Sequence, residues 1–195
     1  MNERARLQLI HSGHKGTEAE FGRAAEKWGI EETTLSFEGH QMERSKNVEV
    51  LTDAMLAEGK VSMEFVFQTL KRRFATGHGI QRVIQSMFHV VVRTDELFAV
   101  GWIQPDDNVR GGTGWGVGLA KLFNRRVHVF DQDRERWFTW THHAWEPSEP
   151  RLPERAFSAT GTRNLTPAGK MAIHDLFERS LGPAAVAAAA AERSR

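Results

Sequence analysis

The segment RLQLIHSGHKGTEAEFGRAAEKWG, residues 6–29, decides the predicted fold. It opens with the short apolar-alternating run Arg6–Ile10, which is typical of a strand, and the glycine-containing loop Ser12–Thr17 follows at once. Beyond the loop, apolar residues recur every three or four positions from Phe21 to Trp28, which is the spacing of an amphipathic helix. A second run at Thr33–Phe37 predicts another strand, so this part of the chain predicts a β-α-β unit.

The alternation of strand and helix patterns continues toward the C-terminus. Further strands are expected at 97–103, 127–130 and 137–141, and helices at 44–59, 62–74, 80–91 and 166–182. The helix signal at 80–91 is the strongest, although the valine run 90–92 leaves a strand open. We therefore predict an α/β fold, a Rossmann-like doubly wound and mainly parallel sheet with flanking helices and a C-terminal helix. Ligands bind at the carboxyl ends of the strands in such sheets.

Composition shifts indicate where the chain divides. The prolines of Pro147–Pro153 predict a linker over 147–165. We expect a Rossmann-like ligand-binding domain over 1–146, with a helical insertion at about 48–95, and a C-terminal helix and tail over 166–195.

The composition also narrows the possible functions. The 195 residues include no cysteine and no tyrosine, which excludes disulfides, thiolate nucleophiles and a phenol as acid or base. The 26 basic and 25 acidic residues leave a net charge of +1, which argues against a nucleic-acid partner. No apolar run of about 18 residues and no signal-peptide pattern is present, so we expect a cytoplasmic protein without a membrane partner. The pairs His11/His14 and His142/His143 lack the further ligands that a metal site needs, so no metal is expected.

A second glycine cluster, Gly111–Gly118, follows the apolar run Leu97–Ile103 as the first loop follows its strand. Such glycines let backbone N–H groups approach an anion, and the helix N-terminus adds about half a positive charge. Phosphate suits a site of this kind, and both loops of a doubly wound sheet can face one crevice. Neither loop fits the dinucleotide fingerprint or the P-loop pattern, which argues against a usual NAD or ATP site. The alternative is that the glycines only permit positive φ or tight packing.

The two loops and nearby basic side chains give the candidate ligand contacts. Arg44 could bind a phosphate through two hydrogen bonds, and Lys15 could do so as a point charge. Trp115 could stack on a base, or it could wedge its loop against the sheet or a partner subunit. The candidate residues are Ser12, Gly13, His14, Lys15, Gly16, Thr17, Arg44, Gly111, Gly112, Thr113, Gly114, Trp115 and Gly116.

Three short motifs resemble the Rossmann-like nucleotide-binding superfamily called SLOG. They are the loop Ser12–Glu18, the pair Arg44 and Asn47, and the later Gly111–Gly114. The superfamily includes the LONELY GUY phosphoribohydrolases, the DNA-processing protein DprA and proteins thought to carry the molybdenum cofactor. The resemblance covers about residues 6–132 and implies a nucleotide-like ligand, with Asn47 beside Arg44 among its contacts.

The resemblance also bears on activity and assembly. The phosphoribohydrolase motif maps onto Arg110–Gly118, with Trp115 in place of a threonine and Gly118 in place of the catalytic glutamate. A homodimer is implied, and the apolar helix predicted at Ile80–Val91 also favours one.

Three functions are compatible with these residues. The preferred one is binding of a nucleotide or nucleotide-derived, phosphate-bearing small molecule between the two glycine loops, with no other cofactor certain. The first alternative is a hydrolase of nucleotide N-glycosidic bonds, in which Glu43 or Glu18 replaces the missing acid. The second alternative is DprA-like binding of single-stranded nucleic acid, with Lys71–Arg73 and Arg125–Arg126 as the basic runs.

Overall fold

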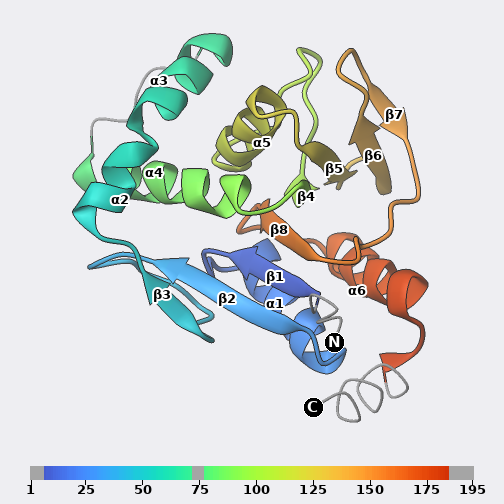
Figure 1. Cartoon of the computed structure of the whole chain (residues 1–195). Coiled ribbons are helices and arrows are strands. Elements are labelled where there is room, and N and C mark those ends of the chain that lie inside the picture. Colours follow the sequence, from blue (N-terminus) through green and yellow to red (C-terminus); the bar gives the residue numbers. More distant parts are fainter. Residues whose placement is uncertain (1–6, 72–76, 185–195) are drawn as a thin grey trace, which may run out of the picture.

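The computed structural model describes residues 7–71 and 77–184 of the chain. In these ranges, eight strands form one sheet in the order β3-β2-β1-β8-β4-β5-β6-β7 (Figure 1). All neighbouring strands from β3 to β5 in this order run parallel, and β6 and β7 add an antiparallel edge. The strands are β1 (Gln8–His11), β2 (Glu31–Ser36), β3 (Val48–Val50), β4 (Glu96–Gly101), β5 (Arg126–Asp131), β6 (Arg136–Trp140), β7 (Trp145–Pro147) and β8 (Ala156–Gly161).

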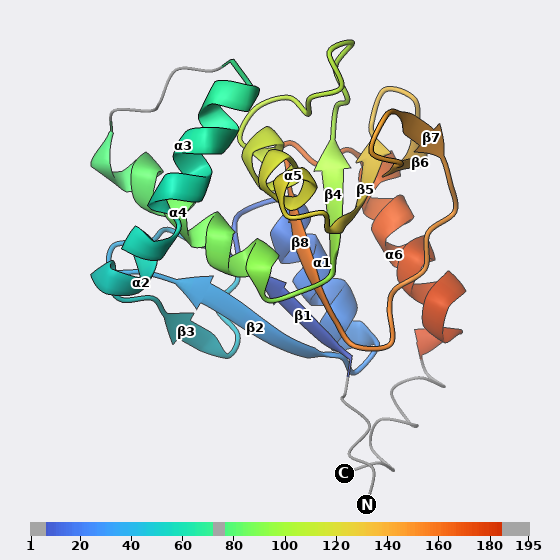
Figure 2. The ribbon, with the colours of Figure 1, turned by 45° about the horizontal axis from the view of Figure 1, so that its top comes forward.

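Helices cover both faces of the sheet, as Figure 2 shows. They are α1 (Thr17–Lys27), α2 (Asp53–Glu58), α3 (Lys60–Thr69), α4 (His78–Val92), α5 (Thr113–Leu122) and α6 (Pro167–Leu181). α1 and α6 pack together on one face around Phe21, Phe157 and Phe177. On the other face α5 packs against β4 and β5, and α4 packs against β2 and β8, while α3 packs onto α4 and α5. This arrangement confirms the predicted α/β fold, a mainly parallel sheet with flanking helices and a C-terminal helix.

Strand β8 corrects the predicted division of the chain. It lies inside the segment 147–165, which we expected to be a linker, and it pairs with β1 and β4 in the middle of the sheet. Its small residues fit this position because helices approach both faces closely. A Cβ on Gly161 would lie 2.5 Å from the Thr17 side chain of α1, and Gly116 of α5 contacts Thr160. A boundary at residue 146 would remove a central strand, so the predicted linker is wrong.

Helix α4 settles the ambiguous apolar run in favour of a helix. Its side chains Ile84, Met87, Val90 and Val91 are buried within the fold. The sheet and the neighbouring helices therefore cover most of the apolar pattern, whereas Ile80 is 52% exposed, and the homodimer stays a prediction. The predicted helix end at 74, the basic residues at 72–73 and the tail 185–195 lie outside the described residues.

Helix α6 begins and ends as its sequence signals predict. The hydroxyl of Thr166 accepts a hydrogen bond from the Gly169 N–H, and Pro167 occupies the first turn. Gly182, with a φ of 81°, ends the helix. Among the described residues, no helix combines the length and apolar character that crossing a membrane requires.

Candidate functional site

A cavity of about 540 Å³ opens at the carboxyl ends of β1, β8 and β4. This is where an open α/β sheet changes the direction of its strand order, and where such folds bind ligands. The lining residues come from four segments: His14 and Glu18 after β1, Trp102, Arg110, Gly111, Gly112, Thr113 and Trp115 after β4, Thr160 to Asn164 at the end of β8, and Ile80, Val83, Ile84 and Met87 of α4.

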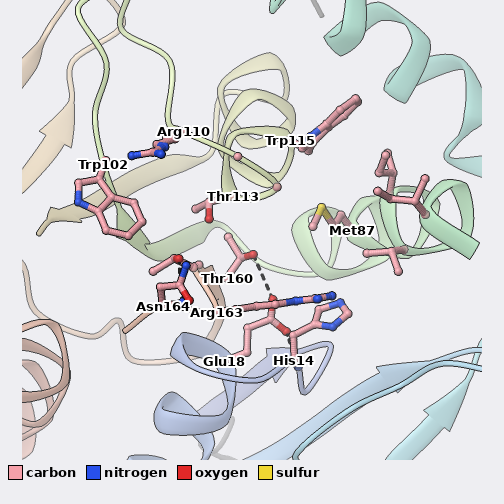
Figure 3. Close-up of a pocket in the computed structure, with 17 residues that line it drawn as sticks. His14, Glu18, Met87, Trp102, Arg110, Thr113, Trp115, Thr160, Arg163 and Asn164 are labelled. Carbon is pink, nitrogen blue, oxygen red and sulfur yellow. Dashed lines mark hydrogen bonds between the residues drawn. The ribbon is translucent and has the colours of Figure 1, made fainter. Parts of the chain in front are cut away.

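The walls of this cavity differ in character. Figure 3 shows Trp102 and Arg110 on one side and Met87 on the opposite side, with His14 and Glu18 below. The α4 wall is apolar, whereas the loops after β4 and β8 supply the polar groups. Arg110 lies over the Trp102 ring at 5.6 Å, and among the described residues neither Arg110 nor Arg163 has an ion-pair partner. The cavity thus offers two arginines without an ion-pair partner, together with the Glu18 carboxylate, beside an apolar surface.

The second glycine loop presents its backbone to this cavity. Gly111 and Gly112 are exposed, and nothing lies within 4 Å of the place of a Cβ on either residue. Helix α5 begins directly after them at Thr113, so its positive end faces the cavity. Trp115 lines the same cavity and also packs edge-on against Phe67, with ring centroids 3.8 Å apart. It therefore holds the loop against α3.

The first glycine loop uses its N–H groups internally. Ser12 N and His14 N donate to Glu18 Oε2 at 3.0 and 3.2 Å, and Gly13 N donates to His11 Nδ1 at 3.0 Å. The other carboxylate oxygen, Glu18 Oε1, accepts a hydrogen bond from the Thr160 hydroxyl at 3.2 Å. The loop does receive an anion, but that anion is the carboxylate of the protein's own Glu18.

The first loop is also fixed to the segment after β8. Both the N–H and the hydroxyl of Thr17 donate to the Thr162 carbonyl, at 3.1 and 3.0 Å. A Cβ on Gly16 would lie 2.6 Å from the carbonyl oxygens of Thr162 and Arg163, so only glycine allows this approach. These contacts bring His14 and Arg163 to the same cavity. Gly16 and Thr17 are thus structural contacts here.

Arg44 and Asn47 close a loop onto β2 and do not line the cavity. Arg44 Nε and Nη2 donate to the two oxygens of Glu32, at 2.6 and 2.7 Å, and Nη2 also reaches Glu26 at 3.1 Å. Asn47 Nδ2 donates to the Glu32 carbonyl at 2.9 Å. Burial of the Glu32 carboxyl opposes ionisation, but hydrogen bonds from His11 and Arg44 outweigh it and lower its pKa to about 2. The guanidinium expected at a phosphate serves a buried carboxylate.

Some of the remaining predicted residues line the cavity, and others lie outside it. Lys15 is exposed outside the cavity lining, and Glu43 pairs with Arg23 on the surface. Gly118 faces Val66 of α3 rather than the cavity. Of the predicted ligand residues, the cavity brings together His14, Gly111, Gly112, Thr113 and Trp115.

Sequence reasoning missed the residues after β8 and the α4 wall. Thr160, Arg163 and Asn164 fell within the expected linker, although a Gly-Thr turn followed by an arginine after an apolar run is itself a binding-loop signal. Arg110 directly precedes the pair Gly111–Gly112, but the sequence motifs did not indicate it as a ligand contact.

A second histidine, His40, contacts His14. The Nε2 atoms of His14 and His40 lie 3.4 Å apart, and the His40 ring stacks on Phe37 with centroids 4.4 Å apart. Burial and the neighbouring His14 lower the pKa of His40 to about 4, against an opposing effect of Glu18. Among the described residues no group of three or more histidine, aspartate or glutamate side chains is arranged to hold a metal ion.

The low pKa of His40 predicts a loss of stability in mild acid. In the unfolded chain the pKa is 6.5, so between pH 6.5 and 4 the unfolded state binds the extra proton and the folded state does not. The contribution is therefore complete above pH 6.5 and falls as the pH drops to 4. We expect the free energy of unfolding to drop by about 2 kcal/mol from pH 7.5 to pH 5. Urea unfolding of the wild type and His40→Gln measures this, and an equally steep decline in the variant would contradict it.

Comparisons with known proteins support the fold. No protein-family model and no curated protein sequence matches the chain. A solved structure, named "Putative molybdenum carrier protein" and coming from Syntrophus aciditrophicus SB, is similar with a TM-score of 0.51. The sequence identity is 14%, and the match covers 91% of this chain and 96% of the other. The likeness extends over nearly all of the chain and concerns the fold.

Proposed function

We propose that this chain binds a nucleotide or nucleotide-derived, phosphate-bearing small molecule in the cavity above β1, β8 and β4. One observation carries the proposal: a single cavity combines the exposed loop Gly111–Gly112 at the positive end of α5 with Arg110 and Arg163. Backbone N–H groups at a helix N-terminus and guanidinium groups both favour phosphate oxygens.

The rest of the cavity suits the organic part of such a ligand. Its volume of about 540 Å³ lies within the usual range for small-molecule sites. Ile80, Val83, Ile84 and Met87 provide an apolar surface for a planar ring, and Trp102 lies at the opposite side. The sequence-based hypothesis placed the ligand between the two glycine loops. We place the phosphate at the second loop alone, because there is space in front of Gly111 and Gly112 and none at Gly13 and Gly16.

The comparison adds limited support. The similar structure is named "Putative molybdenum carrier protein", and a carrier role is consistent with binding of a small ligand. Membership of the SLOG superfamily, a homodimer and a cytoplasmic location are part of this proposal and rest on the sequence motifs and composition.

The two alternatives have less support from the site. A hydrolase could use Glu18, which lines the cavity, but both of its carboxylate oxygens already accept hydrogen bonds. For nucleic-acid binding, Arg125 and Arg126 are paired with Asp95 and Glu96 at the other end of β4. Release of free base from nucleoside monophosphates, or salt-sensitive binding of single strands, would favour one of these alternatives.

Gly112→Val tests the proposed phosphate position. The φ of Gly112 is −61°, and nothing lies within 4 Å of the place of its Cβ, so valine fits without strain and stability changes little. Its side chain would fill the space in front of the loop. We expect nucleotide affinity, measured by titration calorimetry against a panel of nucleoside mono- and diphosphates, to fall at least about tenfold.

Arg163→Gln and Arg110→Gln complete this test. Each removes one charge-assisted contact and should weaken binding about tenfold. Arg134→Gln is the matched control, because Arg134 is exposed and outside the cavity lining. Mass spectrometry of molecules released from the denatured wild type identifies a ligand that copurifies. The proposal fails if no nucleotide binds at millimolar concentration and none is released.

A further inference from the structure

Glu18 occupies a place in which several hydrogen-bond donors converge. Its side chain is almost fully buried in the first turn of α1, and the cavity lies directly beside it (Figure 3). Two loop N–H groups, from Ser12 and His14, donate to Oε2, and the Thr160 hydroxyl donates to Oε1. Two backbone N–H groups and a hydroxyl at the start of a helix form the donor set that usually receives a phosphate.

The carboxylate also compensates the positive end of α1. A negative side chain in the first turn satisfies the partial charge that would otherwise attract an external anion. A phosphate approaching from the cavity would therefore find these N–H groups already bonded and would meet a like charge that is only partly screened by solvent.

We propose that Glu18 is a built-in anion that fills the phosphate position of the first glycine loop and restricts the cavity to ligands whose negative charge lies at one end. The inference rests on the proposed function and specifies its ligand class. The single anionic group binds at Gly111–Thr113, and the part of the ligand facing β1 is neutral or carries hydrogen-bond donors such as hydroxyl or amino groups. A compound with two separated phosphates, which would span both loops, is disfavoured.

Removing the carboxylate should turn the first loop into an open anion site. In Glu18→Ala the N–H groups of Ser12 and His14 lose their acceptor, and the vacated space adjoins the cavity. We expect acetate and inorganic phosphate to raise the unfolding temperature of Glu18→Ala with an apparent dissociation constant at least about tenfold below that of the wild type. Sodium chloride at equal ionic strength controls for screening.

Glu58→Ala is the control. Glu58 is an exposed carboxylate at the end of α2, outside the cavity lining, and has no ion-pair partner among the described residues. This variant loses the same charge without freeing a cation and should gain no anion site. Stabilisation of Glu18→Ala by acetate and phosphate no greater than that of the wild type or of Glu58→Ala would overturn the inference.

Glu18→Gln provides a second test if the alanine variant does not fold. Glutamine has the same shape, its carbonyl can accept from the loop, and its amide can donate to the Thr160 hydroxyl. With the negative charge gone, the affinity for inorganic pyrophosphate should rise about tenfold by calorimetry, and an unchanged affinity would count against the inference. Acetate, phosphate and pyrophosphate are the probes, so these results can be interpreted even if no nucleotide binds.

Discussion

Gly13→Ala is expected to lower the free energy of unfolding by about 4 kcal/mol, a large part of the total stability of an ordinary domain. Gly13 has a φ of 71°, which costs an alanine about 1 to 2 kcal/mol. The new Cβ would also lie 2.1 Å from the Arg44 carbonyl oxygen and 2.9 Å from Thr34 Cγ2. The Arg44 carbonyl is a backbone group, and it is fixed next to Gly13 because the N–H groups of Glu43 and Arg44 donate to the Gly13 carbonyl. The steric clash can therefore be removed only by a shift of the whole loop.

Gly39→Ala separates the two causes of this loss. Gly39 also has a positive φ, 82°, but nothing lies within 4 Å of the place of its Cβ. At Gly39 only the cost of the positive φ applies, and we expect the free energy of unfolding to fall by about 1 kcal/mol. Urea unfolding of the two variants beside the wild type gives the difference directly. Equal losses would mean that the close approach of the Arg44 carbonyl does not constrain the first loop.

The position of the first loop could be predicted from the sequence, but its role could not. A strand, a glycine-containing loop and a helix in succession require a tight turn at the carboxyl end of β1, and the structure has one. The pattern does not tell which anion the N–H groups receive. A glutamate in the first helical turn is common as a partner of the helix dipole, so nothing in the residue type marked Glu18 as the acceptor of the loop.

Strand β8 shows why the order of the strands in the sheet could not be predicted from the sequence. Apart from Phe157, its residues AFSATG are small and lack a clear alternation, because α1 and α5 approach the two faces closely. The prolines before it resemble those of a linker. The pairing with β1 joins residues that are 148 positions apart, such as Leu9 with Phe157, and the pairing with β4 joins residues that are 61 positions apart, such as Leu97 with Ser158. The residues Thr160 to Asn164, which β8 and its loop add to the cavity lining, were therefore not predicted either.

Arg44 illustrates how a residue type can fit two roles. A guanidinium suits a phosphate and a carboxylate equally well, because both offer two oxygens at matching spacing. The choice here depends on Glu32, whose side chain is 2% exposed and which needs a positive partner to stay ionised in the interior. Glu32 lies on β2, and the loop at 38–47 carries Arg44 back onto it. Spacing along the chain did not reveal this pair.

Arg44→Met is therefore expected to reduce stability and leave ligand binding intact. Without the guanidinium, the buried Glu32 carboxylate keeps, among the side chains of residues 7–71 and 77–184, only its 3.2 Å contact with His11. The unfolding free energy should therefore fall by about 3 kcal/mol. Nucleotide affinity should stay within about twofold of the wild type, because Arg44 does not line the cavity. This is the opposite of the result expected for Gly112→Val.

The pH dependence of the Arg44→Met effect identifies its cause. In the wild type the pKa of Glu32 is about 2, against 4.5 when unfolded, so its contribution is complete above pH 4.5 and is lost as the pH falls through 2. The stability difference between wild type and Arg44→Met should narrow over that range. Adding Glu32→Gln to Arg44→Met should restore part of the loss, since no unpaired charge then remains buried. A phosphate-binding role for Arg44 would instead give a variant of normal stability with weakened nucleotide binding, and urea unfolding together with calorimetry distinguishes the two outcomes.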